Sequence, residues 1–264
     1  IGMDKKYTLV YSINNEPNPK TVYVNLTNAC TNSCVFCLRE QKDDVCGAEM
    51  WHDDKYTLED VIKQFKSYNP TPQNVVFCGY GEPFLKKDMM KKFAQYLREN
   101  YPEIKIRVNT NGHANAVYKT NVAEEFKGLL DEASVSLNSD NSEQYNEICQ
   151  PKIENAYGAV KDFLKCCKEA GIKTYASIVT GFDEREINVE NCEKIAKELE
   201  IGVPTVKDII KELHTYIKKG DNYENLYQAL KIEMSFEEEI FNMAKELYEN
   251  SGNYNFMNME TYEQ

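Results

Sequence analysis

The sequence predicts an α/β fold in which helices connect parallel strands into either an open sheet or a barrel. Short runs rich in β-branched residues alternate with longer amphipathic stretches from residue 21 to residue 181. The order strand, helix, strand is repeated along this stretch, and such an order gives parallel strands with right-handed crossover connections. A chain of 264 residues is long enough to bury the core of one such domain.

The expected strands begin in β-branched or aromatic runs and end in polar or glycine-rich segments. They are residues 21–27, 74–80, 105–110, 133–138 and 173–180. The helices expected after them are residues 57–68, 87–100, 121–130, 156–171 and 189–200. Thr57 and Asp60 have the spacing of a capping box at the start of the first helix, and Gly171 is suited to the end of the fourth.

The C-terminal part of the chain departs from this repeat. Residues 201–207 are the candidate for a sixth strand, but Pro204 interrupts the run because proline cannot donate to a sheet ladder. Helical patterns follow at once. We therefore expect an α/β domain over residues 1–204 and a helical C-terminal extension over residues 205–264.

Composition excludes several classes of protein. A net charge of -12 argues against a protein that binds nucleic acid through phosphate neutralisation. The first residues lack the pattern of a secretory signal, and no apolar run approaches the roughly 18 residues of a membrane span. A cytoplasmic protein without membrane contact is expected. In that compartment its nine cysteines are reduced thiols or metal ligands rather than disulfides.

Polar or glycine-rich clusters follow each expected strand. In parallel α/β folds the carboxyl ends of the strands share one edge, and catalytic and ligand-binding residues are found there. These clusters therefore predict a single site. In chain order they are the cysteines of residues 30–37, Gly79 to Pro83, Asn109 to Gly112, Ser136 with Asn138, and Val179 to Glu184.

The first cluster holds three cysteines, Cys30, Cys34 and Cys37, in a polar loop. Closely spaced thiolates on a loop suit an iron–sulfur cluster, and three ligands for four irons leave one iron open. The alternative is a zinc site completed by Cys46 or His52, although neither forms the second cysteine pair that zinc sites favour. Three unrelated buried thiols are a third interpretation, which the polar loop disfavours.

The string "CTNSCVFC" resembles the C-x3-C-x2-C signature of the radical S-adenosylmethionine (SAM) superfamily, with the aromatic Phe36 before the last cysteine. The longer string "VYVNLTNACTNSCVFCLRE" is similar to a small subgroup of that superfamily linked to TatD-type nucleases. The resemblance covers about residues 7–200. It implies a partial (β/α)6-type barrel and a 4Fe-4S cluster on Cys30, Cys34 and Cys37.

The resemblance also implies a chemistry. The open iron of the cluster takes SAM, and one electron cleaves it to methionine and a 5′-deoxyadenosyl radical, which abstracts hydrogen from a substrate that the sequence does not identify. The electron comes from a donor such as flavodoxin or ferredoxin, and the open iron makes the enzyme oxygen-sensitive. A small molecule or a peptide is favoured over nucleic acid as the substrate.

Two turns are implied to line the SAM pocket. Tyr80, Gly81, Glu82 and Pro83 match the G-G-E-P turn of the family, whose backbone meets the SAM amino group, with Tyr80 in place of the first glycine. From the next strand, the resemblance makes Asn109 and Asn111 pocket-lining candidates.

The remaining candidates follow later strands. Ser136 and Asn138 resemble the polar contacts of the family to the SAM ribose and carboxylate. The chain matches the G-x-I-x-G-x-x-E pattern of the family, with Ser177 in place of the first glycine. By this resemblance Val179 is the apolar residue that packs against adenine, and Phe36 lies in the same region. The rest of the pattern is Gly181 and Glu184. Arg39 and His113 are weaker, substrate-side candidates.

A rival function belongs to another class of protein: a non-catalytic zinc or iron–sulfur binding module, with the acidic helical tail binding a protein partner. A module that needed only a structural metal would leave the SAM-like motifs unexplained. The sequence therefore favours the enzyme.

Overall fold

The structure is a computed structural model, and it describes residues 7–40, 44–45 and 48–201. The strands are β1 (Val10–Tyr11), β2 (Thr21–Val24), β3 (Asp44–Val45), β4 (Ala48–Glu49), β5 (Asn74–Phe77), β6 (Lys105–Thr110), β7 (Glu132–Ser136) and β8 (Lys173–Ser177). The helices are α1 (Leu58–Lys66), α2 (Lys87–Asn100), α3 (Ala114–Tyr118), α4 (Val122–Glu125), α5 (Ser142–Cys149), α6 (Ala156–Glu169) and α7 (Val189–Glu198).

The main sheet has the strand order β1-β2-β5-β6-β7-β8. The last five of these strands are parallel, and β1 pairs antiparallel with the outer edge of β2. The five parallel strands are the five that the sequence predicts, so the predicted α/β class is confirmed. A separate pair, β3 and β4, is antiparallel.

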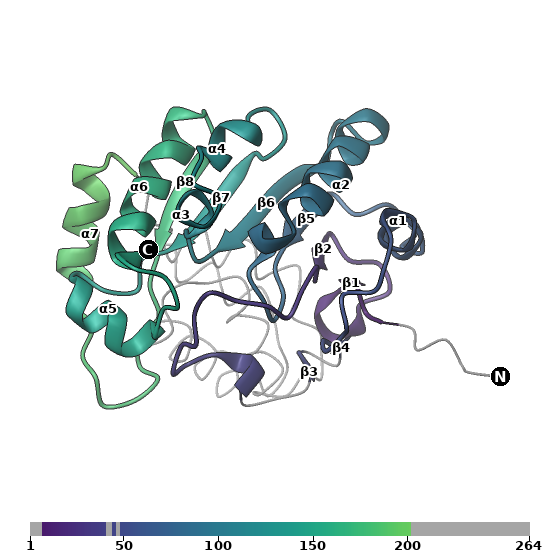
Figure 1. Cartoon of the computed structure of the whole chain (residues 1–264). Coiled ribbons are helices and arrows are strands. Elements are labelled where there is room, and N and C mark those ends of the chain that lie inside the picture. The colour runs from purple at the N-terminus through teal and green to yellow at the C-terminus, as the bar shows by residue number, and fades with distance from the viewer. Residues whose placement is uncertain (1–6, 41–43, 46–47, 202–264) are drawn as a thin grey trace, which may run out of the picture.

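One face of the sheet is buried beneath helices, among them α1, α2, α4 and α6 (Figure 1). Alternate residues of the strands point to opposite faces, and Val24, Phe77 and Val108 are paired neighbours on the helical face. Phe93 of α2 and Phe163 of α6 are fully buried in the same core. This layer holds the strands in place and aligns their carboxyl ends.

The other face of the sheet is divided. Over β2 and β5 a small apolar cluster includes Tyr23, Met50, Val76 and Tyr80. Over β6 to β8 the corresponding alternate residues are mostly polar and half-buried: Arg107, Asn109, Ser134, Ser136 and Tyr175. The polar half of this face leads to the strand ends where the predicted site lies.

Several elements differ from expectation. The predicted helix at 121–130 is the single turn α4 followed by further turns, because Gly128 adopts a left-handed φ of 76°. The short helices α3 and α5 and the edge strand β1 are not predicted, since none has a long periodic pattern. The predicted strand at 201–207 lies outside the described residues beyond Ile201, and so does the helical extension at 205–264.

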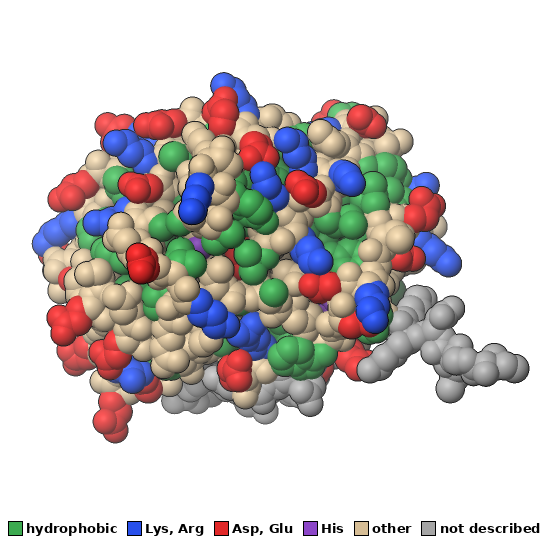
Figure 2. All heavy atoms as spheres, in the orientation of Figure 1, with side chains coloured by type: hydrophobic (Ala, Val, Ile, Leu, Met, Phe, Trp, Pro, Cys, Tyr) green, Lys and Arg blue, Asp and Glu red, His purple; other side chains and the backbone are tan. Residues whose placement is uncertain are grey.

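Further features of the described residues are their surface charge and their hydropathy. Figure 2 shows acidic and basic side chains interspersed over the visible helical face, without a patch of one sign. Among the described helices, none has the length and apolar character needed to span a bilayer.

Candidate functional site

The three clustered cysteines lie on the loop that follows β2, and their side chains are half-buried free thiols. The end of α5 fixes this loop through two backbone hydrogen bonds. The amide N of Ser33 donates to the carbonyl O of Cys149 (3.0 Å), and the amide N of Val35 donates to that of Ile148 (2.9 Å), both at the end of α5. These contacts hold the loop backbone against the end of α5.

The surroundings of the three thiols raise the pKa of each of them. Burial raises the pKa of Cys30 to about 11, with help from the nearby Glu82 carboxyl, and it raises the pKa of Cys37. The pKa of Cys34 is raised by a hydrogen bond with the Cys149 thiol and by burial. A metal that binds here would displace the protons of these thiols, because thiolates are the ligands.

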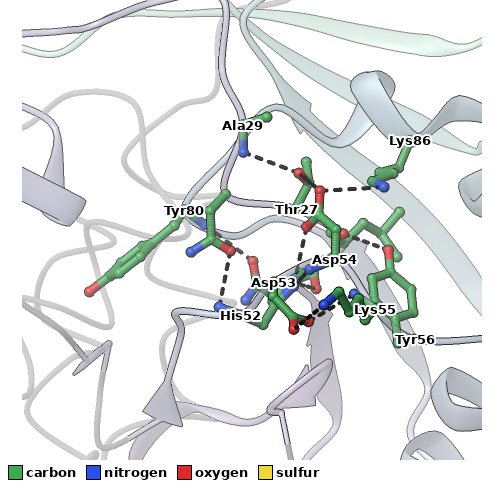
Figure 3. Close-up of polar contacts among 12 residues, drawn as sticks. Thr27, Ala29, His52, Asp53, Asp54, Lys55, Tyr56, Tyr80 and Lys86 are labelled. Carbon is green, nitrogen blue, oxygen red and sulfur yellow. Dashed lines mark hydrogen bonds and ion pairs between the residues drawn. The ribbon is translucent and has the colours of Figure 1, made fainter.

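A polar network anchors the chain between β2 and the cysteines (Figure 3). The Thr27 hydroxyl donates to the Asp54 carboxylate (2.8 Å) and accepts from the Ala29 amide (3.1 Å). Lys86 forms an ion pair with the same carboxylate (3.3 Å). This network ties the residues just before Cys30 to the segment at residues 52–56 and to the turn that follows β5.

His52 is engaged through both ring nitrogens. Its Nδ1 accepts a hydrogen bond from the Asp54 amide (3.1 Å), and Nε2 therefore carries the proton that it donates to the carbonyl of Asn25 (3.1 Å). Burial lowers the pKa of His52, which also favours the neutral ring. His52 is therefore unsuited to complete a zinc site, and Cys46, the other sequence candidate, lies outside the described residues.

The predicted glycine turn packs directly against the cysteine loop. A Cβ at Gly81 would lie 2.4 Å from the carbonyl oxygens of both Thr27 and Ala29, so only glycine fits. The amide N of Glu82 donates to the Ala29 carbonyl (2.8 Å). Pro83 is buried and begins a short 3-10 helix. The Tyr80 ring is buried and meets Trp51 edge-on, 5.2 Å between centroids.

The Glu82 carboxyl is buried and accepts three hydrogen bonds. The donors are the Thr110 hydroxyl (2.7 Å), the Asn111 amide (2.7 Å) and the Phe84 amide (3.1 Å). Burial raises its pKa to about 7, and the three donors oppose that shift. From the sequence we expect Glu82 to act through its backbone, as part of a turn that meets SAM. In the structure its side chain also links the turn after β5 to the end of β6.

Asn111 and His113 belong to a buried network behind Cys30. The Asn111 Nδ2 lies 3.7 Å from the Cys30 sulfur and donates to the Thr31 hydroxyl (2.8 Å). His113 is fully buried between the Thr31 hydroxyl (2.7 Å) and the Tyr145 hydroxyl (2.8 Å). Burial lowers the pKa of His113 to about 4. It is neither a surface histidine nor exposed to a substrate, and it supports the loop.

The remaining strand-end candidates follow β6, β7 and β8. Asn109 and Ser136 are half-buried on the polar half of the sheet, and Val179 is half-buried beyond β8. Asn138 is buried with a left-handed φ of 60°, and its Nδ2 donates to the Cys149 sulfur (3.4 Å). Within the described residues its Oδ1, although buried, has no hydrogen-bond partner.

The last candidates lie around the loop after β8. Phe36 contacts Phe182 with 5.0 Å between ring centroids, which brings this loop to the cysteines. Gly181 and Glu184 are exposed. Arg39 donates to the Asn28 carbonyl (2.8 Å) and so braces the cysteine loop from within.

Three residues that contact the site are not among the sequence candidates: Thr31, Tyr145 and Cys149. Thr31 lies inside the cysteine string, but a single threonine in a polar loop carries no distinctive signal. Tyr145 and Cys149 are on α5, a helix that the sequence pattern did not predict, and they lie more than one hundred residues from their partners in the loop.

The fold defines the class: a partial barrel of parallel strands, with polar clusters at their carboxyl edge. The model of the radical SAM superfamily matches residues 24–196. The chain therefore belongs to the radical SAM superfamily.

Individual relatives are distant. The chain is 25% identical over 174 residues to a protein of Methanocaldococcus jannaschii described as a probable GTP 3′,8-cyclase; the match covers 65% of this chain and 52% of that protein. The chain thus spans about half the length of this curated relative.

Solved structures share the fold at lower identity. Methylornithine synthase is 11% identical with a TM-score of 0.52, over 83% of this chain and 71% of that one. A radical SAM methyltransferase from Sphaerobacter thermophilus is 17% identical with a TM-score of 0.50, over 74% and 62%. Both support the partial-barrel architecture.

Proposed function

We propose that the chain cleaves SAM reductively at a 4Fe-4S cluster held by Cys30, Cys34 and Cys37, and that the resulting radical abstracts hydrogen from a substrate. The observation that carries the proposal is the placement of these half-buried thiols against the glycine turn after β5, with the polar strand ends beside them.

By their chemistry the residues present fit both groups, although among the described residues no three His, Cys, Asp or Glu side chains converge on a single metal ion. The proposed ligands are three thiols on one loop. Three thiolates can bind three of the four irons of a 4Fe-4S cluster, which leaves one iron open. The buried Oδ1 of Asn138 needs a donor that the described residues do not supply. A ribose hydroxyl of SAM is such a donor.

The proposed cofactor residues have distinct tasks. When bound, the cluster and SAM together supply the electron transfer and the 5′-deoxyadenosyl radical. The backbone of Tyr80, Gly81, Glu82 and Pro83 would receive the SAM amino group, and Ser136 and Asn138 its ribose and carboxylate. The adenine would lie beside Phe36 and Val179. Further residues proposed for the pocket are Asn109, Asn111, Gly181 and Glu184.

The polar half of the sheet supports the proposal of a polar substrate. Arg107, Asn109, Ser134 and Tyr175 are half-buried on this half of the sheet. A small molecule or a peptide is proposed rather than nucleic acid, since the chain carries a net charge of -12. A flavodoxin or ferredoxin is proposed as the electron donor.

Finer aspects of the proposal come from the sequence. The string from Val22 to Glu40 supports membership of the TatD-linked subgroup. The change in pattern near residue 204 supports a radical SAM domain over residues 1–204 with a helical extension over 205–264. We also propose that the enzyme is cytoplasmic. We propose that it is oxygen-sensitive, because an open iron lacks a protecting thiolate.

The test is anaerobic. The chain is reconstituted with iron and sulfide, reduced with dithionite and given SAM, and 5′-deoxyadenosine is quantified by mass spectrometry. Production that is lost in Cys34→Ala supports the proposal. The matched control is Cys192→Ala, because Cys192 is a buried thiol of α7 outside the proposed ligand set, and its replacement should leave production unchanged.

Two results would count against the proposal. Zinc in place of iron, without SAM binding, would favour the non-catalytic module; the family match and the engagement of His52 disfavour that alternative. Equal 5′-deoxyadenosine from Cys34→Ala and the parent chain would show that the cysteine loop is not the site of cleavage.

A further inference from the structure

A fourth cysteine contacts the cysteine loop from outside the motif. Cys149 is the last residue of α5 and is fully inaccessible to solvent. Its thiol lies beside that of Cys34, since it is the largest influence that raises the pKa of Cys34. The two backbone bonds from Ser33 and Val35 to the carbonyls of Cys149 and Ile148 hold the helix end and the loop in register. Cys149 is thus a member of the main core cluster that also borders the cysteine loop.

The contacts of the Cys149 sulfur determine where its proton goes. Asn138 donates Nδ2–H to this sulfur over 3.4 Å, so the sulfur already accepts one hydrogen bond. Its own S–H remains to be donated, and Cys34 is the side chain placed to accept it. When Cys34 serves as a metal ligand it is a thiolate and has no proton to give. The direction of the bond is then fixed, from Cys149 to Cys34.

A hydrogen bond to a ligand sulfur changes the electronics of an iron–sulfur cluster. It withdraws charge from the thiolate and stabilises the more negative, reduced state, so the reduction potential rises. The bond is buried, where water does not screen it and the effect is therefore larger than at the surface.

On the basis of the proposed function, we propose that Cys149 is a positioning residue that raises the reduction potential of the cluster by donating S–H···S to Cys34. Asn138 orients it, and because Asn138 is also a proposed SAM contact, it links the SAM pocket to a cluster ligand. Cys149 itself is not a ligand and does not touch the substrate.

The experiment is a potentiometric titration of the reconstituted full-length chain, followed by electron paramagnetic resonance, without SAM. Cys149→Ala and Cys149→Val both remove the donor but leave different volumes, so a shift common to both reports the hydrogen bond rather than packing. Cys149→Ser keeps an O–H donor. Cys192→Ala is the buried-thiol control.

We expect Cys149→Ala and Cys149→Val to lower the midpoint potential by about 59 mV, a tenfold change in the equilibrium constant of this one-electron couple. Cys149→Ser should recover most of the shift, and Cys192→Ala should not move the potential. Iron content and the oxidised absorption spectrum should match the parent in all four variants.

Several outcomes would overturn the inference. An unchanged potential in both donor-free variants would mean that Cys149 only packs. Loss of iron in Cys149→Ala and Cys149→Val would mean that it is a ligand. A parent chain that takes up no cluster would instead refute the proposed function itself, so the two failures are distinct.

Discussion

The buried Glu82 makes the stability of the chain fall as the pH rises. Its carboxyl has a native pKa of about 7, against an ordinary value of 4.5. Between these values the native state binds more protons than the unfolded chain, and stability is lost with increasing pH. With 1.36 kcal/mol for each pKa unit, the full effect is about 3 kcal/mol. Of this, about 2 to 3 kcal/mol is lost between pH 5 and pH 8.

The assay compares the parent chain with Glu82→Gln by chemical denaturation of the iron-free protein at several pH values. Glutamine does not titrate, so the difference in unfolding free energy between the two chains isolates the carboxyl, while any constant cost of the amide cancels. From pH 5 to pH 8, we expect the unfolding free energy of the parent to fall by about 2 to 3 kcal/mol relative to that of Glu82→Gln. A difference that stays constant across this range would refute the reasoning.

Two further predictions concern contacts around the site, and a third concerns a contact away from it. His113→Phe should cost about 1–3 kcal/mol of unfolding free energy, because the buried hydroxyls of Thr31 and Tyr145 lose their partner; urea denaturation measures it, and an unchanged midpoint would contradict it. Gly81→Ala should disturb the cysteine loop and reduce iron uptake, since its Cβ would meet two carbonyls at 2.4 Å; full iron content would show that the turn can move. Thr57→Ala should cost about 1 kcal/mol by removing the observed capping box of α1, without affecting iron uptake, and thereby serves as a control for stability loss away from the site.

Much of the framework could be predicted from the sequence because its signals are local. The strand β6 and the helix α2 have the predicted bounds, since a β-branched run and an amphipathic period each determine their own element. The capping box at Thr57 is likewise a contact between residues three apart. The strand-end clusters are brought to one edge because parallel topology alone places them there.

What the sequence did not predict depends on contacts across the chain. The burial of His113 follows from Tyr145, thirty-two residues away on a helix too short to show a period. The role of the Glu82 side chain requires the end of β6 to lie beside the turn after β5. Cys149 looked like any small apolar residue until α5 placed it at Cys34. Only tertiary geometry gives these residues their partners.

The attachment of the cysteine loop to α5 and to the turn after β5 has a consequence for maturation of the protein. In metal sites that form only when the ion arrives, part of the binding free energy is consumed in ordering the ligands. Here the ordering entropy of the loop is offset during folding, by the backbone bonds of Ser33 and Val35 and by the close packing at Gly81. The backbone of the loop is therefore fixed before any cluster is inserted, and insertion requires the three thiols to turn toward one another and lose their protons rather than the loop to fold.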